Sequence, residues 1–195
     1  MIFGISGYAT VGKDTFADSM HYLLLKRKIN CYRESFAKQL KLQMEGFLMM
    51  NFKISALTSK EEEKKIIRPL LVAFGEAKRK INPDYWVGVL DHLLLKNGLT
   101  IISDVRYENE ADWIISKGGK ILHLNRMNED GSYVQPANKE EELNSPNVIK
   151  KCFHELCWKT MPDKNQTNEV VQSFVDTILT EELEKWKVTF PLSKG

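Results

Sequence analysis

The sequence predicts a three-layer α/β fold, in which helices cover both faces of a mostly parallel sheet. Short apolar runs alternate with longer helical patterns, the first run stands at the start of the chain, and residues 99–103 form a strongly apolar run that ends at Asp104. Right-handed crossovers between parallel strands place a ligand crevice at the carboxyl ends of the strands. The residues that follow Ile5, Ser103 and Leu124 are therefore the first candidates for function.

The N-terminal part is predicted to form a strand, a helix and a second strand. Residues 2–5 are a short apolar run, which is typical of a buried parallel strand. Apolar residues then recur at three- and four-residue steps, which predicts a helix with one buried face. Residues 29–35 fit the second strand.

Residues 36–97 have a mostly helical pattern. Three apolar stripes run through this region, and turn-forming residues separate or end them. The stripes begin at Phe36, Ile67 and Trp86, and the turn-forming residues are Pro83 and Gly98. A helical region is therefore expected between the second and third strands.

The C-terminal half continues the alternation. Residues 99–103 are the third strand and residues 108–116 a helix that glycines end. Residues 121–124 form the fourth strand, and a polar loop with two prolines follows. Residues 156–158 fit a last strand, and an amphipathic helix over residues 171–186 closes the chain.

Composition indicates a soluble protein of a reducing, cytoplasmic compartment. The net charge is only +2 without a basic tail, so nucleic acid is not an expected partner. No apolar run is long enough to cross a bilayer, so no membrane is expected either. The odd count of 3 cysteines also argues against a disulfide framework. Cys152, His154 and Cys157 fit no common zinc spacing and are interpreted as packing residues.

A glycine-rich segment with the pattern G-x-x-x-x-G-K follows the first strand and precedes the first helix. In this context its backbone N–H groups can surround phosphate oxygens, Lys13 adds a positive charge, and the helix presents its positive end. The alternative is a glycine-rich turn that binds nothing. The expected phosphate-binding residues are Gly7, Tyr8, Ala9, Thr10, Val11, Gly12, Lys13, Asp14 and Thr15.

Asp14 is the irregular residue of this segment, because a hydroxyl residue usually follows the lysine and ligates Mg²⁺. Asp14 could supply a carboxylate to the metal, or Thr15 could supply the hydroxyl one position later. The alternative for Asp14 is a favourable acid in the first helical turn. An acid beside phosphates repels them unless a cation intervenes, which favours the metal-linked interpretation.

The segment after the third strand carries a second cluster. Asp104 ends a buried strand that lies beside the phosphate loop in this architecture, where it can hold Mg²⁺ through water. Arg106 could bind a phosphate with both arms of its guanidinium. The alternatives are that Asp104 caps the next helix and that Arg106 pairs with Glu110.

Three segments together resemble the deoxynucleoside monophosphate kinases that many bacteriophages encode. They are the loop at residues 7–15 with its Gly-Lys-Asp-Thr ending, residues 68–87, and the Ser-Asp-Val-Arg-Tyr-Glu-Asn-Glu segment at residues 103–110. Residues 35–41 are also similar. Phosphomevalonate kinases share the Gly-Lys-Asp ending, so that ending alone does not choose the acceptor.

The resemblance implies one P-loop kinase domain over residues 1–195, with a five-stranded parallel core. It implies an acceptor-binding helical region at about residues 36–97 and a lid-like region at about residues 125–150. Arg126 would lie where such kinases place lid or base-contacting arginines. Two departures stand out: few arginines follow Arg126, and Glu108 stands where the family pattern has proline.

The implied reaction is transfer of the γ-phosphoryl group of ATP to a deoxynucleoside monophosphate, with Mg²⁺ as the metal. Lys13, Asp14, Asp104, Arg106 and Arg126 are the expected catalytic residues, and Thr15, Asp14 and Asp104 the expected metal ligands. The expected acceptor-binding residues are Phe36, Lys38, Arg68, Arg79, Asp84 and Trp86. Arg33 is a further candidate for the acceptor phosphate, and a homodimer is left open.

Alternative functions remain at this stage. The chain could be a kinase for another phosphorylated small molecule, such as phosphomevalonate or dephospho-coenzyme A. It could also be a nucleotide switch, a motor-like NTPase or a bare binding module. A motor usually has a glutamate beside the acid of the third strand, whereas Val105 follows Asp104 here.

Overall fold

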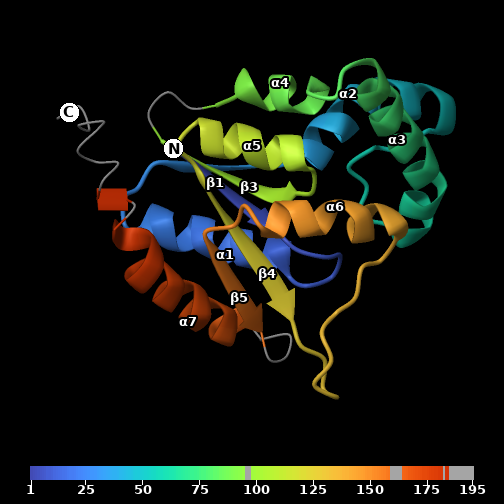
Figure 1. The fold of residues 1–195 in the computed structure, drawn as a ribbon. Coiled ribbons are helices and arrows are strands. Elements are labelled where there is room, and N and C mark those ends of the chain that lie inside the picture. Colours follow the sequence, from blue (N-terminus) through green and yellow to red (C-terminus); the bar gives the residue numbers. More distant parts are fainter. Residues whose placement is uncertain (95–97, 159–163, 182, 185–195) are drawn as a thin grey trace. The chain divides into compact units, whose positions relative to one another are not determined.

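The computed structural model describes residues 1–94, 98–158, 164–181 and 183–184. It divides into two compact units. The first combines Met1–Glu34 with Leu95–Gly195, and the second is Ser35–Leu94. Figure 1 labels the helices and strands of the two units. No helix in the described ranges has both the length and the apolar character needed to cross a membrane.

The first unit is built on a five-stranded parallel sheet with the order β2-β3-β1-β4-β5. The strands are β1 (Ile2–Ser6), β2 (Cys31–Glu34), β3 (Leu99–Val105), β4 (Lys120–Arg126) and β5 (His154–Trp158). The central strand β1 is buried along its whole length, as its apolar sequence predicts. The predicted α/β class with a parallel sheet is therefore confirmed.

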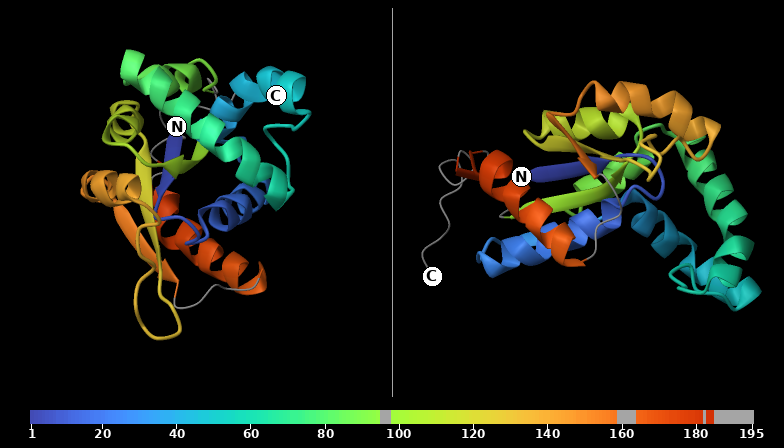
Figure 2. Two further views of the ribbon diagram at one scale, coloured as in Figure 1. Left: turned by 90° about the vertical axis from the view of Figure 1, so that its right-hand side faces the viewer. Right: turned by 90° about the horizontal axis from the view of Figure 1, so that it is seen from below.

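Two pairs of helices cover this sheet. Helix α1 (Lys13–Lys26) and helix α7 (Lys164–Phe174) lie on one face, and α5 (Glu108–Ser116) and α6 (Lys139–Ile149) lie on the other (Figure 2). A π-helical turn, η1 (Val175–Leu179), continues α7. The main apolar core fills the space between the sheet and the α1/α7 pair, where the rings of Phe3 and Phe16 both contact Phe174 edge to face.

The second unit consists of three helices, α2 (Phe36–Phe52), α3 (Glu61–Ile81) and α4 (Tyr85–Asp91). Its small core includes Met44, Leu48 and Ile67. Helix α2 begins at an N-cap serine, because the Ser35 hydroxyl accepts the backbone N–H of Lys38 at 3.0 Å. The predicted break around Pro83 is confirmed.

Some predicted boundaries were wrong. The last helix of the second unit ends at Asp91 rather than beside Gly98, because the following backbone bonds are turn bonds, such as Leu93 N–H to Leu90 O at 2.9 Å. The predicted helical region reaches residue 97 and the predicted closing helix reaches residue 186. Residues 95–97 and 185–186 lie outside the described residues.

Part of the predicted polar loop after β4 is a helix, α6. Asn138 caps it by accepting the backbone N–H of Glu141 at 2.9 Å, and acidic residues occupy its first turn. Pro146 lies inside the helix, and a proline there normally indicates a break. The N-cap at Asn138 and the acidic first turn favour a helix here in spite of this proline.

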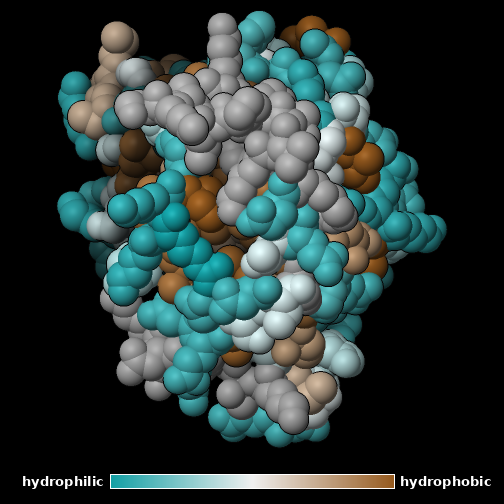
Figure 3. Space-filling view, turned by 90° about the vertical axis from the view of Figure 1, so that its left-hand side faces the viewer, coloured by the Kyte–Doolittle hydropathy of each residue, from teal (hydrophilic) through white to brown (hydrophobic). Residues whose placement is uncertain are grey.

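The space-filling view shows exposed apolar residues scattered among polar ones over the face of the molecule that it presents (Figure 3).

Candidate active site

The segment between β1 and α1 forms a tight loop whose shape requires glycine at two positions. Gly7 has φ +143°, and a Cβ atom there would lie 2.3 Å from the carbonyl oxygen of Leu124. Gly12 has φ +95° and precedes the first turn of α1, where it accepts the Phe16 N–H at 2.9 Å. The glycines thus turn the chain so that the N-terminus of α1 faces the loop.

Lys13 lies back across this loop. Its side chain donates to the carbonyl oxygens of Gly7 at 2.7 Å and Tyr8 at 2.6 Å, and the residue is only 9% exposed. Burial, and to a lesser extent the nearby Arg106, lowers the pKa of Lys13 to about 8, while Glu141 opposes the shift. A buried ammonium group of this kind gains strongly from an anion beside it.

A buried tryptophan at the end of β5 supports the loop from the core of the first unit. The indole N–H of Trp158, at the end of β5, donates to the backbone oxygen of Val11 at 2.8 Å. Val11 and Trp158 are both buried, and the ring of Phe16 packs edge to face on the indole. The loop therefore rests on the core of the first unit.

Asp14 and Asp18 on α1 both form ion pairs with Arg33 from β2. The Ser103 hydroxyl, on β3, donates to the Asp14 carboxylate at 3.3 Å and lies 3.4 Å from the Arg33 guanidinium. Asp14 is therefore placed beside a cation at the carboxyl ends of two strands. Its predicted role as a metal ligand stays a prediction, as does the role of the half-buried Thr15.

Asp104 and Arg106 lie at the end of β3. Asp104 is half-buried and Arg106 exposed, and the Arg106 backbone N–H donates to the Glu110 carboxylate at 2.8 Å. Glu110 also accepts the Tyr107 N–H at 3.1 Å, so this acid fixes the start of α5 through the backbone. Both Asp104 and Arg106 act electrostatically on Lys13, which places their charges around the loop.

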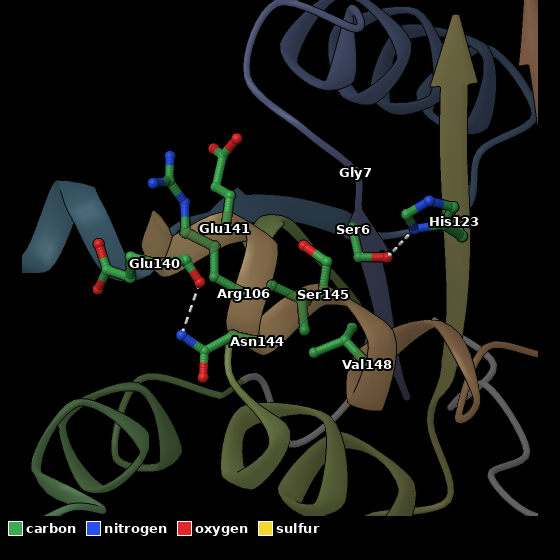
Figure 4. A pocket seen from close by; sticks show the side chains of 10 residues that line it. Ser6, Gly7, Arg106, His123, Glu140, Glu141, Asn144, Ser145 and Val148 are labelled. Atoms are coloured by element: carbon green, nitrogen blue, oxygen red, sulfur yellow. Dashed lines mark hydrogen bonds between the residues drawn. The ribbon is translucent and has the colours of Figure 1, made fainter. Parts of the chain in front are cut away.

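A pocket opens beside the first residues of the loop, between the ends of β3 and β4 and helix α6 (Figure 4). The Ser6 hydroxyl lies 2.9 Å from Nδ1 of His123, and Nε2 of that ring lies 3.1 Å from the Asn125 side-chain oxygen. Nε2 therefore carries the hydrogen, and Ser6 donates to Nδ1. Burial lowers the pKa of His123 below its usual range, which keeps the ring neutral.

Sequence reasoning singled out Gly7 and Arg106 among the residues that line this pocket, and it missed Ser6, His123 and Glu141, among others. His123 is the only one with a signal, because it is a titratable residue inside an otherwise apolar strand. Glu141 is 8% exposed, and its carboxylate accepts the Ala9 N–H of the loop at 3.2 Å. Arg126 ends β4 and is half-buried, and its backbone oxygen accepts the Val134 N–H at 2.9 Å.

The predicted acceptor-binding residues all belong to the second unit. Phe36 and Trp86 are buried, and the Trp86 indole lies 3.4 Å from the Gly75 backbone oxygen and packs on two aromatic rings. Arg79 is half-buried. Lys38, Arg68 and Asp84 are exposed. Their predicted roles stay predictions.

The donors around the loop suit Mg²⁺. Within the described ranges no group of three or more His, Cys, Asp or Glu side chains could hold a metal ion. Mg²⁺ is usually held by one or two protein oxygens together with water and substrate phosphates, so a closed protein cage is not required. Thr15 and Asp104 offer a hydroxyl and a carboxylate on neighbouring elements, which fits that mode.

The cysteines near β5 have packing contacts. The Cys152 thiol lies 3.3 Å from the Val148 backbone oxygen, and burial raises its pKa to about 11. That shift disfavours the thiolate that a metal would need. The Cys157 thiol lies 3.4 Å from the Trp158 backbone oxygen.

No protein-family model matches the sequence, and no curated protein matches it. Among solved structures, the chain is similar to shikimate kinase from Acinetobacter baumannii in complex with shikimate, with 11% identity, coverage of 93% of this chain and 94% of that chain, and a TM-score of 0.47. It is similar to shikimate kinase from Aquifex aeolicus, with 14% identity, coverage of 92% and 99%, and a TM-score of 0.46. It is also similar to the Mycobacterium tuberculosis APS kinase CysC in complex with AMPPNP and APS, with 12% identity, coverage of 90% and 95%, and a TM-score of 0.44. Similarity this low carries no argument about this chain, and its three-layer α/β architecture rests on its own parallel sheet and helices.

Proposed function

We propose that this protein is an ATP-dependent kinase that transfers the γ-phosphoryl group of ATP to a deoxynucleoside monophosphate. The observation that carries the proposal is the loop itself. Gly7 has a geometry that only glycine accommodates, and the buried Lys13 ammonium lies across the loop among charges from the end of β3 and from helices α1 and α6. This arrangement can bind and orient polyphosphate.

The choice of acceptor rests on the sequence resemblance at residues 68–87 and 103–110. An acceptor that is already a phosphate monoester is ionised near neutral pH, so its oxygen needs no strong base. Reaction then depends on alignment and charge neutralisation, which suits a site rich in cations. Arg33 and Arg106, at the ends of neighbouring strands, could hold the transferred and accepting phosphates.

In this mechanism the loop amides and Lys13 hold the ATP phosphates. Thr15, and Asp104 through water, would hold Mg²⁺, which neutralises charge on the β- and γ-phosphates when bound. Arg106 would stabilise the charge that develops during transfer. Arg126 would act from the end of β4. The neutral Ser6–His123 pair keeps the start of the loop in place.

An ADP-release assay tests this proposal. The protein is given ATP, Mg²⁺ and, one at a time, a deoxynucleoside monophosphate, a ribonucleoside monophosphate, phosphomevalonate or no acceptor. We expect release that depends on at least one deoxynucleoside monophosphate and is lost in Lys13→Ala. Release only with phosphomevalonate would support the second candidate, a kinase for another phosphorylated small molecule that shares the Gly-Lys-Asp ending. Release without any acceptor would support an NTPase.

A further inference from the structure

A buried carboxylate from helix α6 contacts the backbone of the phosphate loop. Glu141, from the first turn of α6, is 8% exposed. Its Oε2 atom accepts the backbone N–H of Ala9 at 3.2 Å and the backbone N–H of Ala137 at 3.0 Å. An acid this buried is rarely found without partners, and here one partner is an amide of the loop that is shaped to bind phosphate.

Cationic groups surround the same position. Glu141 favours the charged form of Lys13 while Arg106 opposes it, so both charges act on the lysine of the loop. Arg106 and Glu141 line one pocket, and their side chains extend in the same direction from β3 and α6 (Figure 4). The carboxylate therefore occupies a place where amide and cationic groups favour an anion.

A nucleotide phosphate and this carboxylate need the same surroundings. The Ala9 N–H cannot donate fully to both, and two anions beside one lysine repel each other. Binding of a polyphosphate therefore has to break the contact between Glu141 and Ala9. It also disturbs the contact with Ala137, because one carboxylate oxygen accepts both N–H groups.

We propose that Glu141 is an internal counter-anion of the phosphate loop, which leaves the loop when nucleoside triphosphate binds and thereby sets nucleotide affinity. The proposal rests on the proposed function in that the displacing ligand is ATP. It adds a nucleotide-site residue from the lid-like region, where a glutamate stands close to the loop instead of an arginine. The first turn of α6 must shift when the contact breaks.

Calorimetric binding of ATP with Mg²⁺ tests the competition. Glu141→Gln keeps the shape of the side chain and removes its charge. We expect it to bind ATP about tenfold more tightly than the wild type, because a charge-assisted bond no longer opposes binding. Glu142→Gln, an equal charge change at an exposed position of the same turn, should stay within about twofold of the wild type. Inorganic triphosphate should likewise bind more tightly to Glu141→Gln than to the wild type or to Glu142→Gln.

Hydrogen exchange of the wild type tests the displacement without a substitution. ATP should speed exchange at the Ala137 amide, whose acceptor is lost, and slow it at residues 7–15. Slower exchange at Ala137 on binding would overturn the proposal. So would equal ATP affinity of the wild type and Glu141→Gln, or weaker binding by the variant.

The two proposals fail differently. Wild-type protein that binds ATP and transfers phosphate, with no affinity gain in Glu141→Gln, would overturn only the role of Glu141. A large fall in the kcat of Glu141→Gln at unchanged ATP affinity would overturn that role and would instead indicate that Glu141 is a general base. Wild-type protein that binds neither ATP nor inorganic triphosphate would overturn both.

Discussion

The indole N–H of Trp158 donates to the backbone oxygen of Val11 at 2.8 Å, which joins the last strand of the sheet to the phosphate loop. The two residues are far apart in sequence, and both are buried. The position of the loop amides therefore depends on packing at the far end of the chain. This contact provides a direct way to loosen the loop without touching a group that meets the nucleotide.

Trp158→Phe removes the donor and keeps an aromatic ring. We expect a loss of about 1 kcal/mol in the free energy of unfolding, because a buried carbonyl loses its partner. The KM for ATP should rise several-fold, while kcat changes less. Urea unfolding and steady-state kinetics measure the two effects. An unchanged KM would show that the loop keeps its shape without this bond.

Gly7→Ala should abolish nucleotide binding and destabilise the fold by about 2–4 kcal/mol, because the new methyl group meets a backbone oxygen and φ is positive. Thermal unfolding and ATP calorimetry measure both losses. Gly46→Ala is the matched control, since this glycine lies within α2 and a Cβ atom there has no neighbour within 4 Å. It should stabilise by about 0.5–1 kcal/mol. Tight ATP binding by Gly7→Ala would contradict the loop assignment.

The Asp14–Arg33 pair gives a prediction on charge balance. Arg33→Gln should weaken ATP binding more than Asp14→Asn, because it leaves the carboxylates of Asp14 and Asp18 on α1 without the cation that pairs with both. The double variant should recover part of the loss, and a double-mutant cycle on ATP affinity measures this coupling.

A Mg²⁺ titration of Asp14→Asn separates the two interpretations of Asp14, a metal ligand or a favourable acid in the first turn of α1. A large rise in the Mg²⁺ concentration that gives half-maximal activity would favour Asp14 as a metal ligand.

The lowered pKa of His123 predicts how the free energy of unfolding depends on pH. Burial holds its pKa in the folded state below the value of 6.5 for an unfolded chain, so the unfolded state binds a proton first as pH falls. The protein should therefore lose stability as pH falls below 6.5, until the folded-state pKa is reached. His123→Gln should remove this part of the slope, and His92→Gln, at an exposed position, should not. Thermal unfolding at pH values between about 5.5 and 7.5 measures it. Equal slopes in all three proteins would contradict the prediction.

Much of the fold could be predicted from the sequence, because parallel strands and amphipathic helices leave strong apolar patterns. Strand β1 and the break around Pro83 are local features of this kind. Helix α6 was missed because its segment is polar and contains Pro146, which predicts a loop. Its signal was weak, since few apolar residues mark its buried side.

The candidate site was predictable only where a motif fixes chemistry in consecutive residues. The loop from Gly7 to Thr15 is such a motif. Glu141 and His123 reach the loop through the fold, from elements that are more than a hundred residues away in the chain. His123 is marked only as a titratable residue inside an apolar strand, and no local pattern marks Glu141. Arg33 had been considered for a phosphate, but its pairing with Asp14 depends on how β2 and α1 pack.

The order of the strands also bears on how the chain matures during synthesis. Strand β1 is made before its partners β3 and β4, so that Ile2 has to pair with Thr100 from a later part of the chain. The strand must therefore wait for the whole helical unit at Ser35–Leu94 to be made before it can enter the sheet. That unit has mostly local contacts and can form earlier, because local contacts close quickly. The exposed apolar β1 in the meantime is a segment that a chaperone would bind on the ribosome.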